Sequence, residues 1–197
     1  MISPLCKSTV TISFLLIALH KLVFSNVFAC GYHSPELIRL GSLNLTFPKA
    51  LYVRSAVWDA EVAGILPRSK QPENNTASSS FPRVQLALEI LGARLSNASQ
   101  HINGPSGIAI VLIDSVMWTR FVETSDGYET NIHTDGPESN DIVIVSSSEV
   151  VLAMTRGTLD SQTAEDTGLI RIYRHDSNQD SLRELLQLAT YPGQVEK

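Results

Sequence analysis

Residues 154–173 read MTRGTLDSQTAEDTGLIRIY, and the order of their glycines and caps decides the fold of the C-terminal half. An apolar helix is predicted to end at Gly157, and Asp160 to cap a short acidic helix. Gly168 is predicted to end that helix before an apolar strand over residues 169–173. Both glycines stand where a helix ends in the left-handed conformation, which costs glycine little. The stretch therefore predicts a helix, a short helix and a strand joined by tight corners.

Upstream of this stretch, the spacing of apolar residues changes from helical to strand-like at Gly107. Apolar residues at three- and four-residue spacing predict a helix over residues 82–99. Turn-forming residues separate apolar or alternating runs, which predict strands over 108–113, 117–123, 128–133 and 141–145. A Ser-rich capping sequence at 146–149 opens the next helix, and a last helix is predicted over 181–188. We expect an α+β fold whose five-stranded, mainly antiparallel sheet is covered by helices, the first four strands forming a meander.

The N-terminal half divides into three parts before this domain. Residues 1–29 have the pattern of a signal peptide, and residues 30–67 form a helical segment with helices over 35–40 and 48–66. Trp58 lies in the second of these helices, either as a packing aromatic or as a wall of a binding site. Polar residues 68–80 form a linker to the α+β domain at 81–197.

The signal peptide carries a prediction of location. Lys7 precedes an apolar run over residues 10–19, which is shorter than the roughly 20 residues that span a bilayer. Val27 and Ala29 suit cleavage after Ala29; a signal anchor is the alternative. We expect an exported protein, in the bacterial periplasm or held at the membrane as a lipoprotein.

Cys30 would then be the first mature residue and the single remaining cysteine, so no internal disulfide is expected. The tetrapeptide VFAC at 27–30 resembles a lipobox, which would make Cys30 the site of a lipid anchor. Alternatively, Cys30 and His33 bind a metal ion together with the terminal amine, a role that lipidation of Cys30 excludes.

Composition and motifs exclude several functions. The net charge of −5 gives no basic stripe for nucleic acid. The chain lacks an HExxH motif, a phosphate-binding loop, a dinucleotide fingerprint and a Gly-x-Ser-x-Gly nucleophile, so we predict neither an enzyme nor a cofactor. The Glu165-Asp166 pair is interpreted as part of a solvated helix face.

Residues 141–174, DIVIVSSSEVVLAMTRGTLDSQTAEDTGLIRIYR, resemble the sterol carrier protein family of small lipid-binding domains. The resemblance extends over residues 82–197 through the order of elements, whereas residues 30–80 have no counterpart in that family. One departure is Arg174-His175-Asp176, where family members commonly have glycine after the fifth strand. The residues that carry the resemblance are Ser148, Glu149, Gly157, Leu159, Asp160, Ala164, Gly168 and the strand at 169–173.

The resemblance implies an apolar cavity between sheet and helices. Arg120 could meet a carboxylate or phosphate head group there, or it could be an exposed strand arginine. The candidate wall residues, which could equally form a filled core, are Trp118, Phe121, Val150, Met154, Leu182 and Leu185.

These observations predict a non-catalytic binding protein that holds a lipid, a quinone or another apolar small molecule in the cell envelope. Two alternatives stay open. One is an envelope accessory or assembly protein that binds another protein, and the other is a metal-handling protein that uses Cys30 and His33.

Overall fold

The computed structural model describes residues 35–68, 77–173 and 179–190. The signal peptide, Cys30, His33 and the loop that begins at Arg174 therefore lie outside the described residues. The chain divides into two units after Leu37. The packing below belongs to the unit Ile38–Lys197.

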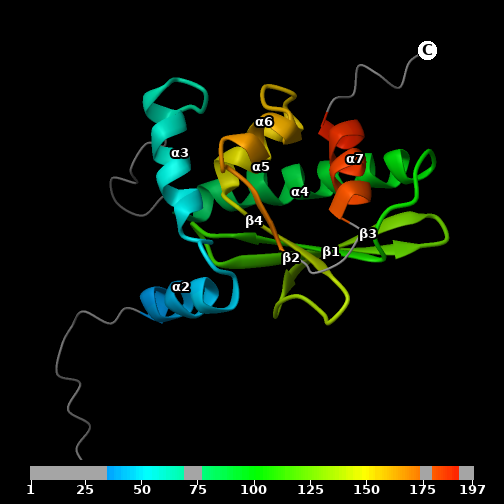
Figure 1. The fold of residues 1–197 in the computed structure, drawn as a ribbon, viewed down its shortest axis with the longest axis horizontal. Coiled ribbons are helices and arrows are strands. Elements are labelled where there is room, and N and C mark those ends of the chain that lie inside the picture. Colours follow the sequence, from blue (N-terminus) through cyan, green and yellow to red (C-terminus); the bar gives the residue numbers. More distant parts are fainter. Residues whose placement is uncertain (1–34, 69–76, 174–178, 191–197) are drawn as a thin grey trace, which may run out of the picture. The chain divides into compact units, whose positions relative to one another are not determined.

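The predicted α+β class is confirmed, and from residue 77 on the elements follow the predicted order (Figure 1). The first helix does not end at Gly41 as predicted but continues to Thr46, and the second begins only at Tyr52, after a turn. The elements are α2 (Pro35–Thr46), α3 (Tyr52–Val62), α4 (Ala77–Ser99), β1 (Gly107–Leu112), β2 (Met117–Thr124), β3 (Gly127–Thr134), β4 (Ile142–Ser146), α5 (Ser148–Thr155), α6 (Ser161–Asp166), β5 (Arg171–Tyr173) and α7 (Gln179–Thr190).

The sheet is mainly antiparallel, with strand order β3-β2-β1-β4-β5. The prediction of a four-strand meander is wrong, because β4 does not pair with β3 but returns to lie parallel to β1. Burial explains why β4 pairs with β1 and not with β3: β1 and β4 are buried along their whole lengths, whereas β3 is partly exposed. Strands that are apolar on both sides belong in the interior of a sheet, and the half-polar β3 takes the edge.

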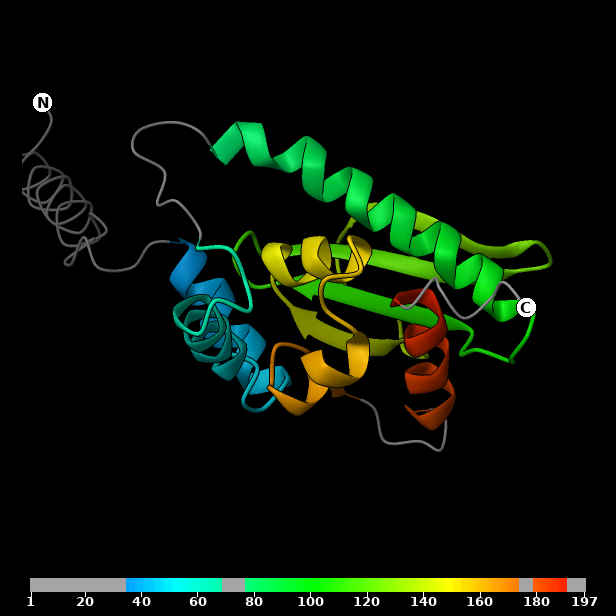
Figure 2. The ribbon, with the colours of Figure 1, turned by 90° about the horizontal axis from the view of Figure 1, so that it is seen from above.

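The two faces of the sheet carry separate apolar cores. On the first face, Ile108 and Ile110 of β1 pack with apolar residues of α4, α5 and α7 (Figure 1; Figure 2 shows these helices from above). On the second face, Val111 of β1 packs with Leu40 and Leu43 of α2. The predicted N-terminal helical segment thus contributes directly to the core of the α+β fold.

The corners quoted at the outset form as predicted. Gly157 and Gly168 have φ angles of 72° and 76°, in the left-handed region. The Asp160 carboxylate caps α6 by accepting a hydrogen bond from the Thr163 N–H at 2.8 Å.

The start of α5 differs from the capping pattern predicted at residues 146–149. Ser147 occupies the N-cap position, but its side chain makes no capping hydrogen bond. The carboxylate of Asp114, in the turn after β1, accepts the bond from the Ser148 N–H instead, at 3.2 and 3.3 Å. A residue distant in sequence therefore supplies this cap.

Glu165 also departs from the interpretation as a solvated residue. Its carboxylate accepts hydrogen bonds from Nε and Nη2 of the Arg183 guanidinium, the shortest from each nitrogen at 2.9 Å, and so ties α6 to α7. Asp166, the other member of the pair, is exposed.

Replacing Asp160 with alanine is expected to lower the free energy of unfolding by about 1 kcal/mol at neutral pH, because α6 loses its cap. The hydrogen bond from the Thr163 backbone holds the pKa of Asp160 below its ordinary value. The stabilisation is therefore complete above the ordinary carboxyl pKa and is lost as the pH falls through the lowered one. Urea unfolding of wild type and Asp160→Ala at neutral and acid pH measures this difference in unfolding free energy. Asp160→Asn is the control, because asparagine caps a helix without titrating. If wild type were more stable than Asp160→Ala by the same amount at acid pH as at neutral pH, the prediction would be contradicted.

Candidate functional site: a pocket on the second face of the sheet

The structure separates the residues predicted to line one cavity. Trp118 lies on the second face of the sheet, beside the α2 core, because side chains of β2 alternate. The other five wall residues lie together in the first-face core and are each at most 3 % exposed: Phe121, Val150, Met154, Leu182 and Leu185. Their role as ligand contacts stays a prediction, and they do not line the pocket described below.

Arg120 is neither an exposed strand arginine nor a free cation. Its side chain is 13 % exposed and its Nε donates to the Asp141 carboxylate at 2.7 Å, with Nη2 at 3.2 Å from the other oxygen. Glu138 accepts a further bond from Nη1. The hydrogen bonds to Asp141 are the main cause that raises the pKa of Arg120. Because two carboxylates already hold this guanidinium, it is poorly placed to receive the acidic head group of a ligand.

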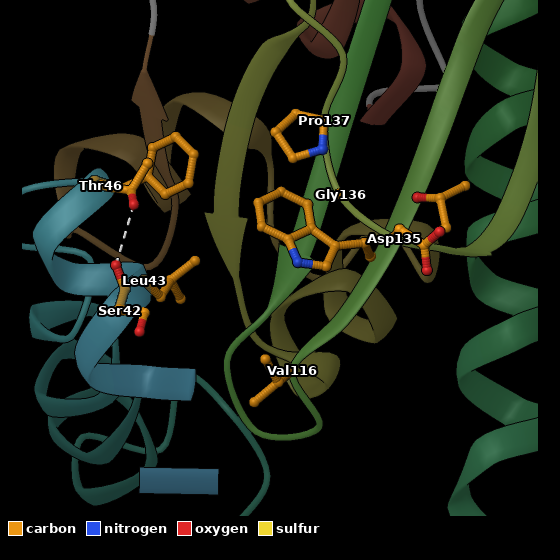
Figure 3. Close-up of a pocket in the computed structure, with 10 residues that line it drawn as sticks. Ser42, Leu43, Thr46, Val116, Asp135, Gly136 and Pro137 are labelled. Carbon is orange, nitrogen blue, oxygen red and sulfur yellow. Dashed lines mark hydrogen bonds between the residues drawn. The ribbon is translucent and has the colours of Figure 1, made fainter. Parts of the chain in front are cut away.

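A pocket of about 590 Å³ lies between α2 and the second face of the sheet, and we call it the second-face pocket (Figure 3). Three segments of the chain form it: α2 with the residue that follows it, the start of β2 with the turn before it, and the end of β3 with the loop that leaves it. Its lining residues are Ser42, Leu43, Thr46, Phe47, Val116, Trp118, Thr134, Asp135, Gly136 and Pro137.

Aromatic contacts position one wall of the pocket. The ring centroid of Phe47 lies 6.0 Å from that of Trp118 and 5.3 Å from that of Tyr173, both at tilted angles. Such tilted pairs add stabilisation beyond the area they bury. The Tyr173 hydroxyl donates to the Pro48 carbonyl at 2.9 Å, and burial raises the pKa of Tyr173, which keeps this donor protonated. The residues after α2 are thus fixed to both β2 and β5.

A bulge in β3 brings Thr134 to the same wall. Thr119 pairs with Ile132, but its neighbour Trp118 pairs with Thr134, so His133 is the extra residue. His133 has a φ of 63°, which is unusual for a residue other than glycine. Bulges re-aim side chains and are frequent beside functional sites. Here the bulge puts Thr134 opposite Trp118, on the pocket side of the sheet.

Backbone strain gathers around this pocket. Three described residues other than glycine have positive φ angles: Lys49 at 67°, Val116 at 49° and His133 at 63°. Val116 lines the pocket, Lys49 follows the pocket residue Phe47 by two positions, and His133 immediately precedes Thr134. Such conformations cost energy and cluster at functional sites, most of all for a β-branched residue such as Val116.

The chemistry of the pocket lining is apolar and aromatic with a few hydroxyl groups. Neither lysine nor arginine lines it, and Asp135 is its one ionisable residue. Within the part of the chain that the structure describes, no group of three or more His, Cys, Asp or Glu could hold a metal ion. The arrangement is suited to bind an apolar molecule.

The sequence identified one of the pocket residues, Trp118, but grouped it with Phe121 as a wall of a single cavity, although the two side chains lie on opposite faces of the sheet. It missed Phe47 and Thr134. The tripeptide Thr46-Phe47-Pro48, an aromatic residue beside a proline after a helix, is a signal that could have pointed to Phe47. No local pattern identifies Thr134, because its orientation depends on the bulge at His133.

None of the helices in the described ranges is long and apolar enough to cross a membrane.

Comparison with known proteins gives a likeness in three dimensions only. No family model matches the chain, and no curated protein matches it. The chain is similar to the solved sterol carrier protein domain 2 of Helicoverpa armigera, with 21 % identity over 66 % of this chain and 98 % of that one, at a TM-score of 0.38. It is also similar to a conserved hypothetical protein of Thermus thermophilus, described as possibly a sterol carrier protein, with 14 % identity over 54 % of this chain and 83 % of that one, at a TM-score of 0.35.

Proposed function

We propose that this protein is a non-catalytic binding protein that holds a lipid, a quinone or another apolar small molecule, and that the second-face pocket is where it does so. We further propose that it acts in the cell envelope after export, in the periplasm or anchored through Cys30. The signal-peptide pattern of residues 1–29 supports the location.

The observation that carries the proposal is the pocket itself. Its volume of about 590 Å³ lies in the range of small-molecule sites, roughly 300–1,000 Å³. Phe47, Trp118 and Val116 offer apolar contact area, which binds a ligand at about 25 cal/mol per Å² removed from water. The resemblance of residues 82–197 to the sterol carrier proteins agrees with an apolar ligand.

A second candidate function rests on a different surface. Trp58 and Val62 lie about one helical turn apart on the side of α3 opposite the buried Val53 and Ala60, and are 64 and 55 % exposed. Ile65, which follows the end of the helix, is 47 % exposed. Trp58, predicted to pack or to line a binding site, is exposed and is not among the lining residues of the second-face pocket. An exposed apolar stripe is typical of protein contacts, which supports the alternative of an envelope accessory protein.

Native mass spectrometry of the protein purified from membrane and soluble fractions of its own cells tests the first function. We expect a companion mass that matches an apolar small molecule and disappears on denaturation. A bare polypeptide in both fractions would count against bound cargo, and a stable protein companion would favour the second function. The denatured mass also reports whether the chain starts at Cys30 and carries a lipid.

A further inference from the structure

We infer that the ligand of the second-face pocket is a ring-bearing molecule without an acidic group, whose carbonyl or hydroxyl oxygen Thr134 binds. This inference rests on the proposed function and makes it more specific: it selects molecules such as ketones, quinones and phenols over molecules with an acidic head group.

The charges around the pocket disfavour an anion. A carboxylate or phosphate moved into the pocket would lose hydration and find no lysine or arginine among the lining residues. Asp135 would repel it. The nearest arginine along β2 is Arg120, two residues after Trp118, and Asp141 and Glu138 already hold its guanidinium. Nothing on the lining compensates a negative charge.

The hydroxyl of Thr134 supplies the polar contact. Its Oγ1 is buried and has no hydrogen-bond partner. Five side-chain atoms among the described residues share this property, and of these five only Thr134 Oγ1 belongs to a residue that lines the second-face pocket. Buried hydroxyl groups without a partner are costly and rare. Rotation of Thr134 by about 120° to another staggered χ1 rotamer moves its hydroxyl to a new position, from which the hydroxyl can face the pocket when a ligand oxygen is there.

The aromatic rings supply the shape selection. Trp118 lies opposite Thr134 across the β2–β3 pair, and Phe47 packs against Trp118. A flat ring that packs beside Trp118 can direct a substituent oxygen toward Thr134 on the neighbouring strand. Apolar walls with a small number of hydrogen-bonding groups are the usual design of a small-molecule site.

Three matched probes test the inference: benzylacetone, hydrocinnamate and phenylpropylamine, which share a phenyl ring on a short alkyl tether and end in a ketone, a carboxylate and an ammonium group. The chain has two tryptophans, and Trp58 is exposed and outside the pocket. In the full chain with Trp58→Phe, one indole N–H resonance remains, from Trp118. Its shift during an NMR titration gives the dissociation constant of each probe.

We expect benzylacetone to bind roughly tenfold more tightly than hydrocinnamate, because the carboxylate is desolvated without a partner. Thr134→Val should weaken benzylacetone roughly fivefold through loss of one hydrogen bond. Thr130→Val, on the same strand but beside Gly92 and Phe121 on the first face, should leave it unchanged. Melting temperatures establish that both variants fold, and the comparison of probes needs neither of them.

The outcomes separate the inference from the function on which it rests. Hydrocinnamate or phenylpropylamine binding as tightly as benzylacetone would overturn the inference and leave an apolar site in place, as would full benzylacetone affinity in folded Thr134→Val. No response of the Trp118 resonance to any of the three probes would overturn the pocket as a binding site and the inference with it.

Discussion

Replacing Phe121 with alanine is expected to lower the free energy of unfolding by about 3–5 kcal/mol, the largest single effect that the structure predicts. Phe121 is fully buried, pairs with Ile108 across β1 and β2, and lies in the first-face core. Gly92 of α4 faces its ring: a Cβ built on Gly92 would stand 3.2 Å from the Phe121 ring, so helix and sheet pack closely there. The truncation leaves a void that this packing cannot readily close. Urea unfolding followed by circular dichroism measures the loss.

The neighbouring residue provides the control for Phe121. Val122 is next in β2, on the opposite face, and is partly exposed. Val122→Ala should cost less than about 1 kcal/mol, because a smaller and partly hydrated group is removed. If Phe121→Ala cost no more than Val122→Ala, Phe121 would line open space rather than a filled core, and the sequence-based cavity on the first face would regain support.

Replacing Asp141 with alanine is expected to cost about 3 kcal/mol. Asp141 is 8 % exposed, and its carboxylate accepts bonds from Arg120 and, at 2.8 Å, from the backbone N–H of Glu138. Removing one partner of a buried ion pair leaves the other charge uncompensated, which is the costly way to break it. The same carboxylate lies against Gly107, where a side chain would collide with it. Thermal and urea unfolding measure the cost.

Glu138 is the matched control, because it binds the same guanidinium from the surface. Its side chain is 71 % exposed, and Glu138→Gln should change stability by less than about 1 kcal/mol. Equal losses for Asp141→Ala and Glu138→Gln would show that the pair with Asp141 is not the buried one, and Arg120 would again be a candidate for ligand binding.

Local chemistry made much of the fold predictable. The glycines at 157 and 168 and the Asp160 cap act through their own backbone and near neighbours, so the corner between α5 and β5 could be read from the sequence. Strand pairing could not: that β4 joins β1 depends on which strands are buried on both faces, a property of the whole sheet. The cap of α5 was missed for a similar reason, because Asp114 lies in another turn.

The candidate site was less predictable than the fold. Alternation along β2 places Trp118 and Phe121 on opposite faces, yet the sequence does not say that α2 covers the second face and creates a pocket there. The role of Arg120 depends on Asp141, which becomes its neighbour only when β4 lies beside β1. Thr134 enters the pocket through a bulge that has no sequence pattern of its own.

A variant that fills the second-face pocket tests whether this pocket holds an apolar small molecule. Ser42 is an exposed α2 residue that lines the pocket, so Ser42→Phe should fill it with little effect on the core. Leu45→Phe is the control on the same helix, at a position that is 85 % exposed and outside the pocket lining.

Native mass spectrometry of wild type, Ser42→Phe and Leu45→Phe, each purified from the native cells, measures whether each protein retains a bound companion. We expect a companion mass on wild type and on Leu45→Phe that is lost or strongly reduced on Ser42→Phe. Equal retention by all three proteins would place the cargo elsewhere, and its absence from all three would contradict the proposed function.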